Sequence, residues 1–598
     1  MLKLGLHLLA LIGALIGVHA NGVYVRTPPP SVYSALSASA KKLFDESMDF
    51  NEQYWDETEG YLFQIDSAGI HDTRATAMYA TALLARNGKH GSDRARAIRI
   101  FEQIVPQQWD QNGTLWYGVY PHTPQDPFPG TSLLGTIPYT SWDPNWRDFV
   151  GTAWILALER SGRLIPDSVV SQVEQSLLKA GKGNLLRYQG RGPYANSVTV
   201  NSSADNLDAV RAVNCMLVVS SYDIFEAYTN PYLMGVFVMS YIGHRLNDTE
   251  LIEKSEEDAQ TIYDLFTYGD FNTFSEYNSG TYTGVDIWAL ALWIKYAPKG
   301  SNVAKYGPFM LNNTLVDLGT LYHAGLRNLA GPWDRSYGYD MTRYHSVFGQ
   351  LVTSLAPLHR GAVPSPPAGG LHTNDVACFG PLIPLISSII ADVAPDSVLK
   401  NFADFGTTER ILKRRLRTNV VDETAIRNVT AWLGETVSIG GQSLDEPSAR
   451  QSSNVAAIIQ WLLPSSLYRN ASSTGLPKIG YIALSPPTAS IVNATASKNT
   501  LSISFPPSTR WTNETAPAVV TFAVGGFDMR ASGADMTKGL VGVPGLNISV
   551  ETSGLGNQAT AYSQDGWKAW FSNFYFFNVS YPVTAVWPAV PSITISVS

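Results

Sequence analysis

Two kinds of helical pattern alternate along residues 31–465, and this alternation constrains the fold more than any other feature. One kind is apolar around nearly its whole circumference, and the other carries one apolar stripe and many charges. Helices that are apolar on all sides are buried, whereas helices with a single apolar stripe lie at the surface. The apolar segments are 71–84, 146–158, 231–242, 282–296, 339–355 and 454–463, and the amphipathic segments between them include 94–105, 169–180, 251–266 and 313–326.

Six buried helices that alternate with surface helices predict an (α/α)6 toroid, in which an inner ring of helices lies inside an outer ring. An irregular helical solenoid is the alternative. After about residue 476, short runs rich in Val, Ile, Thr, Ser and Phe are broken by Gly and Pro, which is typical of an antiparallel β-sandwich. We therefore expect a mainly α chain with a signal peptide at 1–20, an (α/α)6 toroid at 21–475 and a smaller C-terminal β-sandwich at 476–598.

The N-terminus has the form of a secretory signal peptide. Lys3 precedes an apolar run from Leu4 to Val18, and Ala20 offers a small residue for cleavage. No later stretch reaches about 18 uninterrupted apolar residues, so we expect no membrane association after cleavage. A secreted, extracellular chain with many Asn-x-Ser/Thr sequons is predicted to carry N-glycans on several of them. The sequons begin at Asn112, Asn201, Asn247, Asn312, Asn428, Asn470, Asn493, Asn513, Asn547 and Asn578.

The charge of the chain is low and nearly balanced. It has 42 Lys+Arg against 50 Asp+Glu, and 15% of its residues are charged, compared with about 25% in typical globular proteins. The chain has no Lys/Arg block that would neutralise a phosphate backbone, so we expect no nucleic-acid partner. Glycans would supply the solubility that charges do not. Cys215 and Cys378 can form one disulfide in an oxidising compartment or stay as free thiols.

Polar and aromatic residues concentrate directly before the apolar helices. In a toroid, the inner helices direct one set of ends into a shared cavity, and the loops before those helices line it. The densest cluster precedes the apolar segment 282–296 and contains the catalytic candidate Glu276. Other clusters lie at 331–345 and 226–230, and smaller ones lie near 71, 142 and 372.

An isolated Asn or Asp before a helix is usually an N-cap, but capping does not require Trp, Tyr, His and Arg beside it. Flat aromatic faces and planar hydrogen-bonding groups suit a cleft that holds sugar rings. The predicted substrate-binding residues all belong to these clusters. They are Tyr228, Tyr277, Asn278, Asp286, Trp333, Asp334, Tyr337, Tyr339, Asp340, Trp142, Asp143, Trp146, His71 and His372.

The layout of signal peptide, helical toroid and β-sandwich resembles the toroid polysaccharide lyases, especially the heparinase II/III-like group, and other secreted fungal carbohydrate-active enzymes with this toroid. In those lyases an Asn or His at the start of an inner helix neutralises a uronate carboxylate, and a Tyr some fifty residues later serves as base and acid. Here Asn230 precedes an inner helix and Tyr282 follows it by 52 residues. Tyr282 ends a Glu-Tyr-Asn-Ser-Gly-Thr-Tyr segment that is similar in placement to the family's Glu-x-Ser-Pro-x-Tyr, with Gly280 in place of the Pro.

This resemblance implies β-elimination at a uronic acid without a metal or another cofactor. Asn230 would hold the carboxylate, and Tyr282 would abstract the C5 proton and protonate the leaving oxygen. Arg343 and His345 would stabilise the developing charge. His323 and His372 are alternative positions for the histidine.

Two other functions remain open. A glycoside hydrolase needs two carboxylates roughly 5 to 10 Å apart, and Glu276 with Asp334 or Asp340 would be that pair. A non-catalytic protein would instead use the cleft and the β region to bind cell-wall glycan. A polysaccharide or oligosaccharide is the expected partner in every case.

Overall fold

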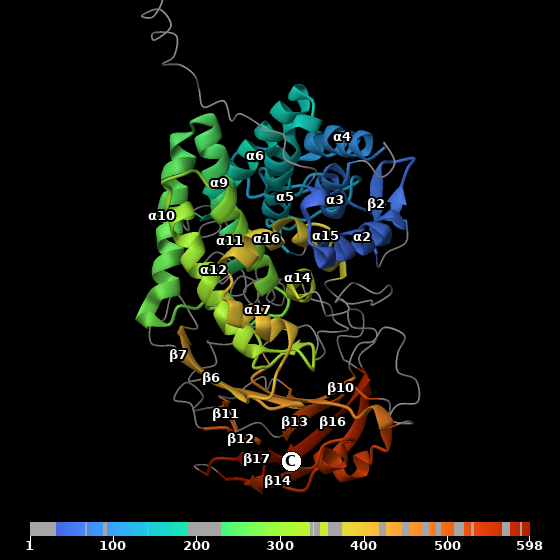
Figure 1. Ribbon diagram of the computed structural model, residues 1–598, viewed down its shortest axis with the longest axis vertical. Coiled ribbons are helices and arrows are strands. Elements are labelled where there is room, and N and C mark those ends of the chain that lie inside the picture. The colour runs from blue at the N-terminus through green and yellow to red at the C-terminus, as the bar shows by residue number, and fades with distance from the viewer. Residues whose placement is uncertain are drawn as a thin grey trace, which may run out of the picture.

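The structure is a computed structural model with a helical N-terminal part and a strand-rich C-terminal part (Figure 1). We call them the helical part (residues 32–403) and the strand-rich part (residues 410–598). The structure describes residues 32–65, 69–87, 92–139, 141–188, 229–334, 336, 339, 347–356, 373–417, 426–444, 455–467, 478–485, 492–506, 519–527, 532–564, 575–586 and 589–598.

Four buried helices form the centre of the helical part, and neighbours in sequence pack against each other. All four run in the same direction, and Tyr241 Oη near the end of α9 donates to Glu159 Oε1 near the end of α5. Arg160 Nε near the end of α5 donates to Tyr296 Oη at the end of α11, 2.7 Å away. At the opposite end, the guanidinium of Arg74 in α3 lies 5.1 Å from the centre of the Trp146 ring in α5. The N-terminal ends of these helices therefore lie together. The helices are α3 (Thr73–Arg86), α5 (Trp146–Ser161), α9 (Thr229–Leu246) and α11 (Thr283–Tyr296).

Two shorter helices close this group, because α14 packs on α11 and α15 packs on both α14 and α3. The amphipathic helices α4, α6, α10 and α12 pack on the outside of α3, α9 and α11. Figure 1 shows α9 and α10 side by side in this arrangement. The remaining helices are α2 (Ala38–Glu52), α4 (Asp93–Ile104), α6 (Asp167–Tyr188), α10 (Thr249–Thr267), α12 (Asn302–Leu321), α14 (Val347–Leu355), α15 (Thr373–Phe379), α16 (Ile383–Val393) and α17 (Asp396–Ala403). Short strands are β1 (Trp55–Asp56), β2 (Tyr61–Phe63), β3 (His71–Asp72), β4 (Tyr322–His323) and β5 (Asn328–Leu329).

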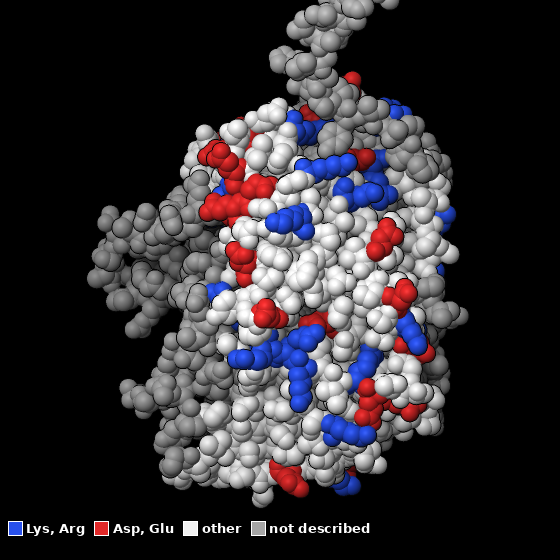
Figure 2. Space-filling view, turned by 60° about the vertical axis from the view of Figure 1, so that its left-hand side comes forward, with Lys and Arg blue, Asp and Glu red and all other residues white. Residues whose placement is uncertain are grey.

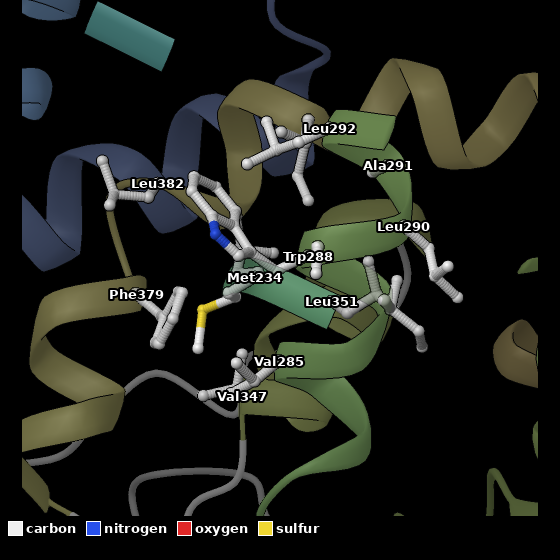
Figure 3. Close-up of a cluster of buried hydrophobic side chains, with 14 of the residues drawn as sticks. Met234, Val285, Trp288, Leu290, Ala291, Leu292, Val347, Leu351, Phe379 and Leu382 are labelled. Atoms are coloured by element: carbon white, nitrogen blue, oxygen red, sulfur yellow. The ribbon is translucent and has the colours of Figure 1, made fainter. Parts of the chain in front are cut away.

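Apolar side chains fill the space between the inner helices (Figure 3). The ring of Trp288 meets Phe379 edge to face with 5.5 Å between centroids, and Met234 lies beside it. Trp288 Nε1 donates a hydrogen bond to Thr152 Oγ1, so the indole nitrogen has a partner without water. Protein interiors are close-packed, and these side chains occupy the space between the inner helices in that way.

The strand-rich part is built on one antiparallel sheet of 12 strands, in the order β14-β17-β12-β11-β8-β9-β10-β13-β16-β15, with β6 joined to β8 through β7. β11 pairs with both β8 and β12. The strands are β6 (Arg410–Arg417), β7 (Ile426–Leu433), β8 (Val437–Leu444), β9 (Ala457–Leu462), β10 (Ile479–Leu484), β11 (Asn493–Ser497), β12 (Thr500–Ser504), β13 (Val519–Gly525), β14 (Ile548–Ser553), β15 (Ala559–Gln564), β16 (Tyr575–Pro582) and β17 (Ser592–Val597).

The two faces of this sheet contribute to two different apolar clusters. Ile458 of β9 and Tyr481 of β10 belong to the cluster that fills the helical part. Their neighbours in sequence, Ile459 and Ile482, belong to a second cluster formed within the strand-rich part. Successive side chains of a strand point to opposite faces. One face of the sheet therefore completes the core of the helical part.

Most of the predicted helices are confirmed. The segments 71–84, 146–158, 231–242 and 282–296 coincide with α3, α5, α9 and α11, and the amphipathic segments 94–105, 169–180 and 251–266 coincide with α4, α6 and α10. The segment 313–326 is helical only to Leu321, where α12 ends. Of the segment 339–355, α14 covers the part from Val347 on.

The predicted helix at 454–463 is wrong, because these residues contain β9. Helices give way to strands between Ala403 and Arg410, so the boundary predicted at residue 476 falls inside the strand-rich part. A continuous apolar run suits a buried strand as well as a buried helix. Both faces of β9 are covered, by the helices on one side and by the second cluster on the other.

Charged side chains are sparse on one face of the molecule. On the face shown in Figure 2, acidic and basic residues are intermingled and large areas carry neither, in agreement with the charged content of 15%. Within the part of the chain that the structure describes, every helix is too short or too polar to span a bilayer.

Candidate active site

The segment that leads into α11 is buried and held by hydrogen bonds to a neighbouring loop. We call residues 274–282 the entry segment. Asn278 in this segment has a φ of 52°, a left-handed conformation that Asn adopts more readily than most residues. Its Nδ2 donates to the carbonyl oxygens of Ala330 and Pro332, both at 2.8 Å. The entry segment is thereby fixed against the loop that precedes residue 335.

A buried arginine from the strand-rich part clamps the same segment. Arg427 of β7 donates through Nη1 and Nη2 to the two carboxylate oxygens of Asp334, at 2.5 and 2.6 Å. Its Nη2 also donates to the carbonyl oxygen of Ser275 at 2.6 Å. Asp334 Oδ2 in turn accepts from the backbone N–H of Tyr277 at 2.9 Å. Asp334 is thus fully engaged in holding the entry segment, and a catalytic or substrate-binding role has no support in its contacts.

Tyr277 is committed to a second contact with α12. Its hydroxyl donates to Asp317 Oδ2 at 3.2 Å, and Arg414 of β6 donates to both oxygens of Asp317. Burial, followed by the charge of Asp317, holds the pKa of Tyr277 well above its usual value. Tyr277 therefore stays a neutral phenol, and its hydroxyl serves as a hydrogen-bond donor rather than as a base.

Three acidic residues, Glu276, Asp286 and Asp317, line one small cavity at the start of α11 together with neutral polar residues and the apolar side chains of Phe274, Leu318 and Leu321. Glu276 and Asp286 are 2% and 0% exposed, and Asn278 and Thr283 line the same cavity, which has a volume of about 30 Å³. This space holds about two water molecules. It is far smaller than the roughly 300 Å³ at which ligand pockets begin, so it does not accommodate a sugar ring.

Asn230 lies in the first turn of α9, at the same end of the helical part. It is 1% exposed, and neither its Oδ1 nor its Nδ2 has a hydrogen-bond partner within the described part of the chain. Its neighbour Thr229 lines a second small cavity together with Phe274 and Ser275 of the entry segment. Buried polar atoms without partners are uncommon in proteins and require an explanation. A ligand group at this helix end is one such explanation.

A third polar group lies at the starts of α3, α5 and α15. Arg74 forms an ion pair of 2.6 Å with Asp375, and its guanidinium lies over the rings of Trp146 and Phe149. The imidazole of His122 lies 4.5 Å from the Trp146 ring. Of the predicted residues near position 142, Trp146 contacts Arg74 directly, and Asp143 lies close enough for its charge to act on Arg74.

The other predicted residues of this region have local roles. His71 lies 3.1 Å from Asp56 Oδ2 through Nε2 and stacks on Phe63. Trp142 is fully buried in a small apolar cluster, and its Nε1 donates to the carbonyl oxygen of Thr136. Asp143 Oδ1 accepts from the backbone N–H of Asn145, as in an ordinary turn before a helix.

Two predicted aromatic residues pack against the strand-rich part instead of facing a cleft. Trp333 is 0% exposed, and its backbone pairs with Val455. Tyr339 stacks on Tyr481 of β10 with 4.7 Å between centroids. These side chains help to join the two parts of the molecule.

His323 is a buried structural histidine. Its Nε2 lies 2.8 Å from the carbonyl oxygen of Gly434, and its Nδ1 accepts from the N–H of Leu326. Both nitrogens are therefore occupied, in the tautomer protonated on Nε2. Burial lowers the pKa of His323 to about 4. Its ring also stacks on Phe405, so His323 has no free group for proton transfer.

Several predicted residues lie outside the part that the structure describes. Cys378 is a buried free thiol, and the other cysteine, Cys215, is among these residues. They are Tyr228, Tyr337, Asp340, Arg343, His345, His372 and Cys215.

Sequence reasoning missed the groups that come from distant parts of the chain. Arg427, Arg414 and Asp317 were not singled out, although they hold the entry segment. The two arginines lie in strands of ordinary appearance, and only the fold brings them to α11. No local pattern could have marked them. Among the described residues, no group of three or more His, Cys, Asp or Glu side chains is arranged to hold a metal ion.

Comparison with protein families identifies the chain. Residues 41–388 match the family described as a domain of unknown function (DUF8769), and residues 408–598 match a second one (DUF8770). The first match covers more than half of the chain, so the protein belongs to the DUF8769 family. No curated protein matches the sequence.

Some solved structures are similar to the chain at low identity. The crystal structure of heparinase III has a TM-score of 0.41 and 8% identity, and the match covers 96% of this chain and 86% of that one. A Paenibacillus xanthan lyase has a TM-score of 0.33 and 10% identity over 94% of this chain, which spans 57% of that enzyme. A second heparinase III, with methylated lysines, has a TM-score of 0.29 and 9% identity over 90% of this chain and 94% of that chain. At these TM-scores the likeness carries no conclusion about function.

Proposed function

We propose that the protein is a polysaccharide lyase that cleaves its substrate by β-elimination next to a uronic acid, at the N-terminal ends of α9 and α11. One observation carries this proposal: the amide of Asn230 is buried, and among the residues that the structure describes neither its donor nor its acceptor has a partner. A substrate carboxylate would accept from Asn230 Nδ2. This bond would withdraw charge from the carboxylate and so acidify the adjacent C5 proton.

Tyr282 is the proposed base and acid. It is the N-cap residue directly before α11 and is 7% exposed. The N-terminal end of a helix favours negative charge, which suits both a phenolate and a substrate carboxylate at this place. In the proposed step the phenolate oxygen removes the C5 proton, a C4–C5 double bond forms, and the C4–O bond breaks. The leaving oxygen then takes the proton from Tyr282.

Two further residues have roles in this proposal that are expected from the sequence alone. Arg343 and His345 would stabilise the developing charge. For the hydrolase alternative, Glu276 and Asp334 are a less favoured pair of catalytic carboxylates. Both oxygens of Asp334 accept hydrogen bonds from Arg427. An uronic-acid polysaccharide is therefore the substrate class that we propose.

The finer features of the fold and the compartment are also proposals. We expect the closed succession of inner helices to be an (α/α)6 toroid and the 12-stranded sheet to fold over into a β-sandwich. Secretion is supported by the form of residues 1–20. N-glycosylation is supported by the sequons, because each described sequon asparagine is exposed or half-buried, as glycan attachment requires.

The test is ultraviolet absorbance of an unsaturated uronide, measured on a panel of acidic polysaccharides that includes pectic, alginate and glucuronan chains. We expect Tyr282→Phe to lower the rate about 10²- to 10⁴-fold and Asn230→Ala to lower it about 10²- to 10³-fold. Tyr296→Phe is the matched control, since it removes a tyrosine hydroxyl at the opposite end of α11 and should leave the rate unchanged. Absence of product from the whole panel would refute the lyase proposal.

A further inference from the structure

A second group of polar and aromatic side chains lies at the same end of the helical part as Asn230 but has no role in the proposed reaction. Arg74 belongs to the first turn of α3, Trp146 is the first residue of α5, and His122 precedes α5 in the chain. Helix α5 packs on α9, which carries Asn230 in its first turn. Packed helices are about 8–10 Å apart, so neighbouring sugar residues of one bound chain would span this distance.

The rings of this group pack against one another and leave one imidazole partly accessible. The guanidinium of Arg74 lies 5.1 Å from the centre of the Trp146 ring and 4.9 Å from that of Phe149. The imidazole of His122 lies 4.5 Å from the Trp146 ring on its other contact. Trp146 is 7% exposed, whereas His122 is half-buried. The tryptophan therefore holds the position of both polar side chains.

Two buried polar atoms of this group have no partner among the described residues. They are Oγ1 of Thr73 and Nε of Arg74, in side chains of residues that are 0% and 9% exposed. The backbone N–H of Thr73 donates to the carbonyl oxygen of His122 at 3.1 Å, so the three residues lie together. Unpartnered polar atoms are uncommon in protein interiors. The hydroxyl groups of a ligand would satisfy both atoms.

His122 has the one imidazole at this end that is available to a ligand, among the four histidines that the structure describes. His71 is paired with a carboxylate, and His323 uses both of its ring nitrogens within the protein. His244 lies at the opposite end of α9, where its Nδ1 contacts a backbone carbonyl oxygen. The ring of His122 forms no hydrogen bond with the described residues. A neutral imidazole offers one donor and one acceptor.

Carboxylates outnumber cations around this group. Arg74 forms an ion pair of 2.6 Å with Asp375, and the charges of Asp72 and Asp143 also act on Arg74. A substrate carboxylate would meet three acidic groups and one guanidinium that is already paired, and like charges repel each other. A neutral sugar offers hydroxyl groups without this cost.

We propose that Thr73, Arg74 and His122 form a subsite for a neutral sugar, next to the position at which the uronic acid is cleaved. His122 and the two unpartnered atoms bind hydroxyl groups of this sugar, and Trp146 holds the imidazole in place. The substrate is then a chain in which a neutral sugar adjoins the uronic acid, rather than a polymer of uronic acid alone. This inference rests on the lyase proposal for the position of the uronic acid.

Binding of oligosaccharides to the full chain tests the subsite without cleavage. The chain carries Tyr282→Phe, and calorimetric titration compares oligosaccharides that alternate a uronic acid with a neutral sugar against oligouronates of equal length. Rhamnogalacturonan and hyaluronan fragments are the alternating probes, and oligogalacturonate and oligoglucuronate are their uronate-only counterparts. We expect an alternating probe to bind about tenfold or more tightly than its counterpart, because like charges are not brought together.

Three further substitutions in this chain locate the effect. His122→Ala should weaken binding of the alternating probe about three- to tenfold, since a hydrogen bond is lost, and should leave binding of the oligouronate unchanged. Asp143→Asn removes one of the repelling charges, so it should tighten binding of the oligouronate about threefold or more. His244→Ala is the matched control at the other end of α9 and should bind like the parent chain.

The outcomes separate the subsite from the lyase chemistry. Selective binding that depends on His122, without unsaturated product from the wild type, would support the subsite and contradict the chemistry. Cleavage of uronate-only chains at a rate that His122→Ala leaves unchanged would support the chemistry and overturn the subsite. Equal affinity for both kinds of probe, or no binding of any probe, would also overturn the subsite.

Discussion

Arg427 shows how one residue of the sheet determines the geometry of a helix start. The Arg427 side chain is 2% exposed, and its guanidinium contacts both Asp334 and Ser275. Breaking a buried ion pair by removing one partner costs about 3–5 kcal/mol, because the other charge is left without compensation. A displacement of the entry segment would break this ion pair and lower the stability of the molecule by that amount.

His323 makes stability depend on pH. Its pKa is about 4 in the folded protein against 6.5 in the unfolded chain, so the unfolded state binds the proton more tightly. The contribution of His323 to the free energy of unfolding is fully present above about pH 6.5. It is lost as the pH falls toward 4, and the total loss is about 3 kcal/mol.

The comparison of wild type with His323→Gln isolates this effect. Urea denaturation at pH 7, 6, 5 and 4 should show the free energy of unfolding of the wild type falling more steeply with acid than that of the variant. The glutamine amide keeps a donor near Gly434 but does not titrate in this range. Parallel curves for the two proteins would contradict the prediction.

At the candidate site, the sequence was sufficient to predict which residues lie together when they are also neighbours along the chain. Glu276, Asn278, Tyr282 and Asp286 precede or begin one apolar helix, and their common location followed from that. Arg427 and Asp334 are 93 positions apart, so their pairing depends on the fold of both parts. Residues such as Trp333, which looked suited to sugar stacking, pack between the parts because aromatic rings serve a core equally well.

At the scale of elements, α11 and α14 approach so closely that only glycine fits between them. A Cβ added to Gly284 would lie against the backbone nitrogen of Phe348 and 2.7 Å from the carbonyl carbon of Val347. Backbone atoms cannot rotate away as a side chain can. The start of α11 therefore depends on the absence of one methyl group.

Gly284→Ala should lower the free energy of unfolding by about 1–3 kcal/mol, as overpacked cores do, despite the better helix propensity of alanine. Gly181→Ala is the matched control in α6. Its nearest contact would be the flexible side chain of Leu251 at 3.1 Å, so we expect little change or a small gain. Chemical denaturation of both variants measures the difference, and equal stabilities would contradict the expected clash.

The helices were predictable and some strands were not, for a physical reason. An apolar helix of fourteen residues such as α11 repeats its pattern over several turns, whereas β9 has six residues and no turn-length repeat. β6 reads Arg-Ile-Leu-Lys-Arg-Arg-Leu-Arg. Its charges conceal it, although charged side chains are common on strands at a sheet edge. Only its pairing with β7 reveals it as a strand.

At the scale of the whole molecule, the helical and strand-rich parts share one apolar cluster. It contains Trp288 of α11 together with Ile458 of β9 and Tyr481 of β10. Arg410 of β6 adds two hydrogen bonds to the helical part, to the carbonyl oxygens of Gly319 and Tyr322. Removing either part would expose apolar surface on the other.

We therefore expect the full chain to unfold in a single thermal transition, because the shared cluster couples the two parts. Calorimetry should give one peak whose calorimetric and van't Hoff enthalpies agree. Ile458→Ala, which truncates a side chain of the cluster from the strand side, should shift that whole peak to lower temperature. Two separate peaks, only one of which responds to the substitution, would contradict the coupling.

The shared cluster also bears on how such chains can evolve. The two family matches, 41–388 and 408–598, divide the sequence near the place where helices give way to strands. A module that owes part of its interior to its neighbour cannot be transferred to another gene without exposing that interior. We expect the two families to be inherited as a pair, in this order, rather than to be exchanged with unrelated partners.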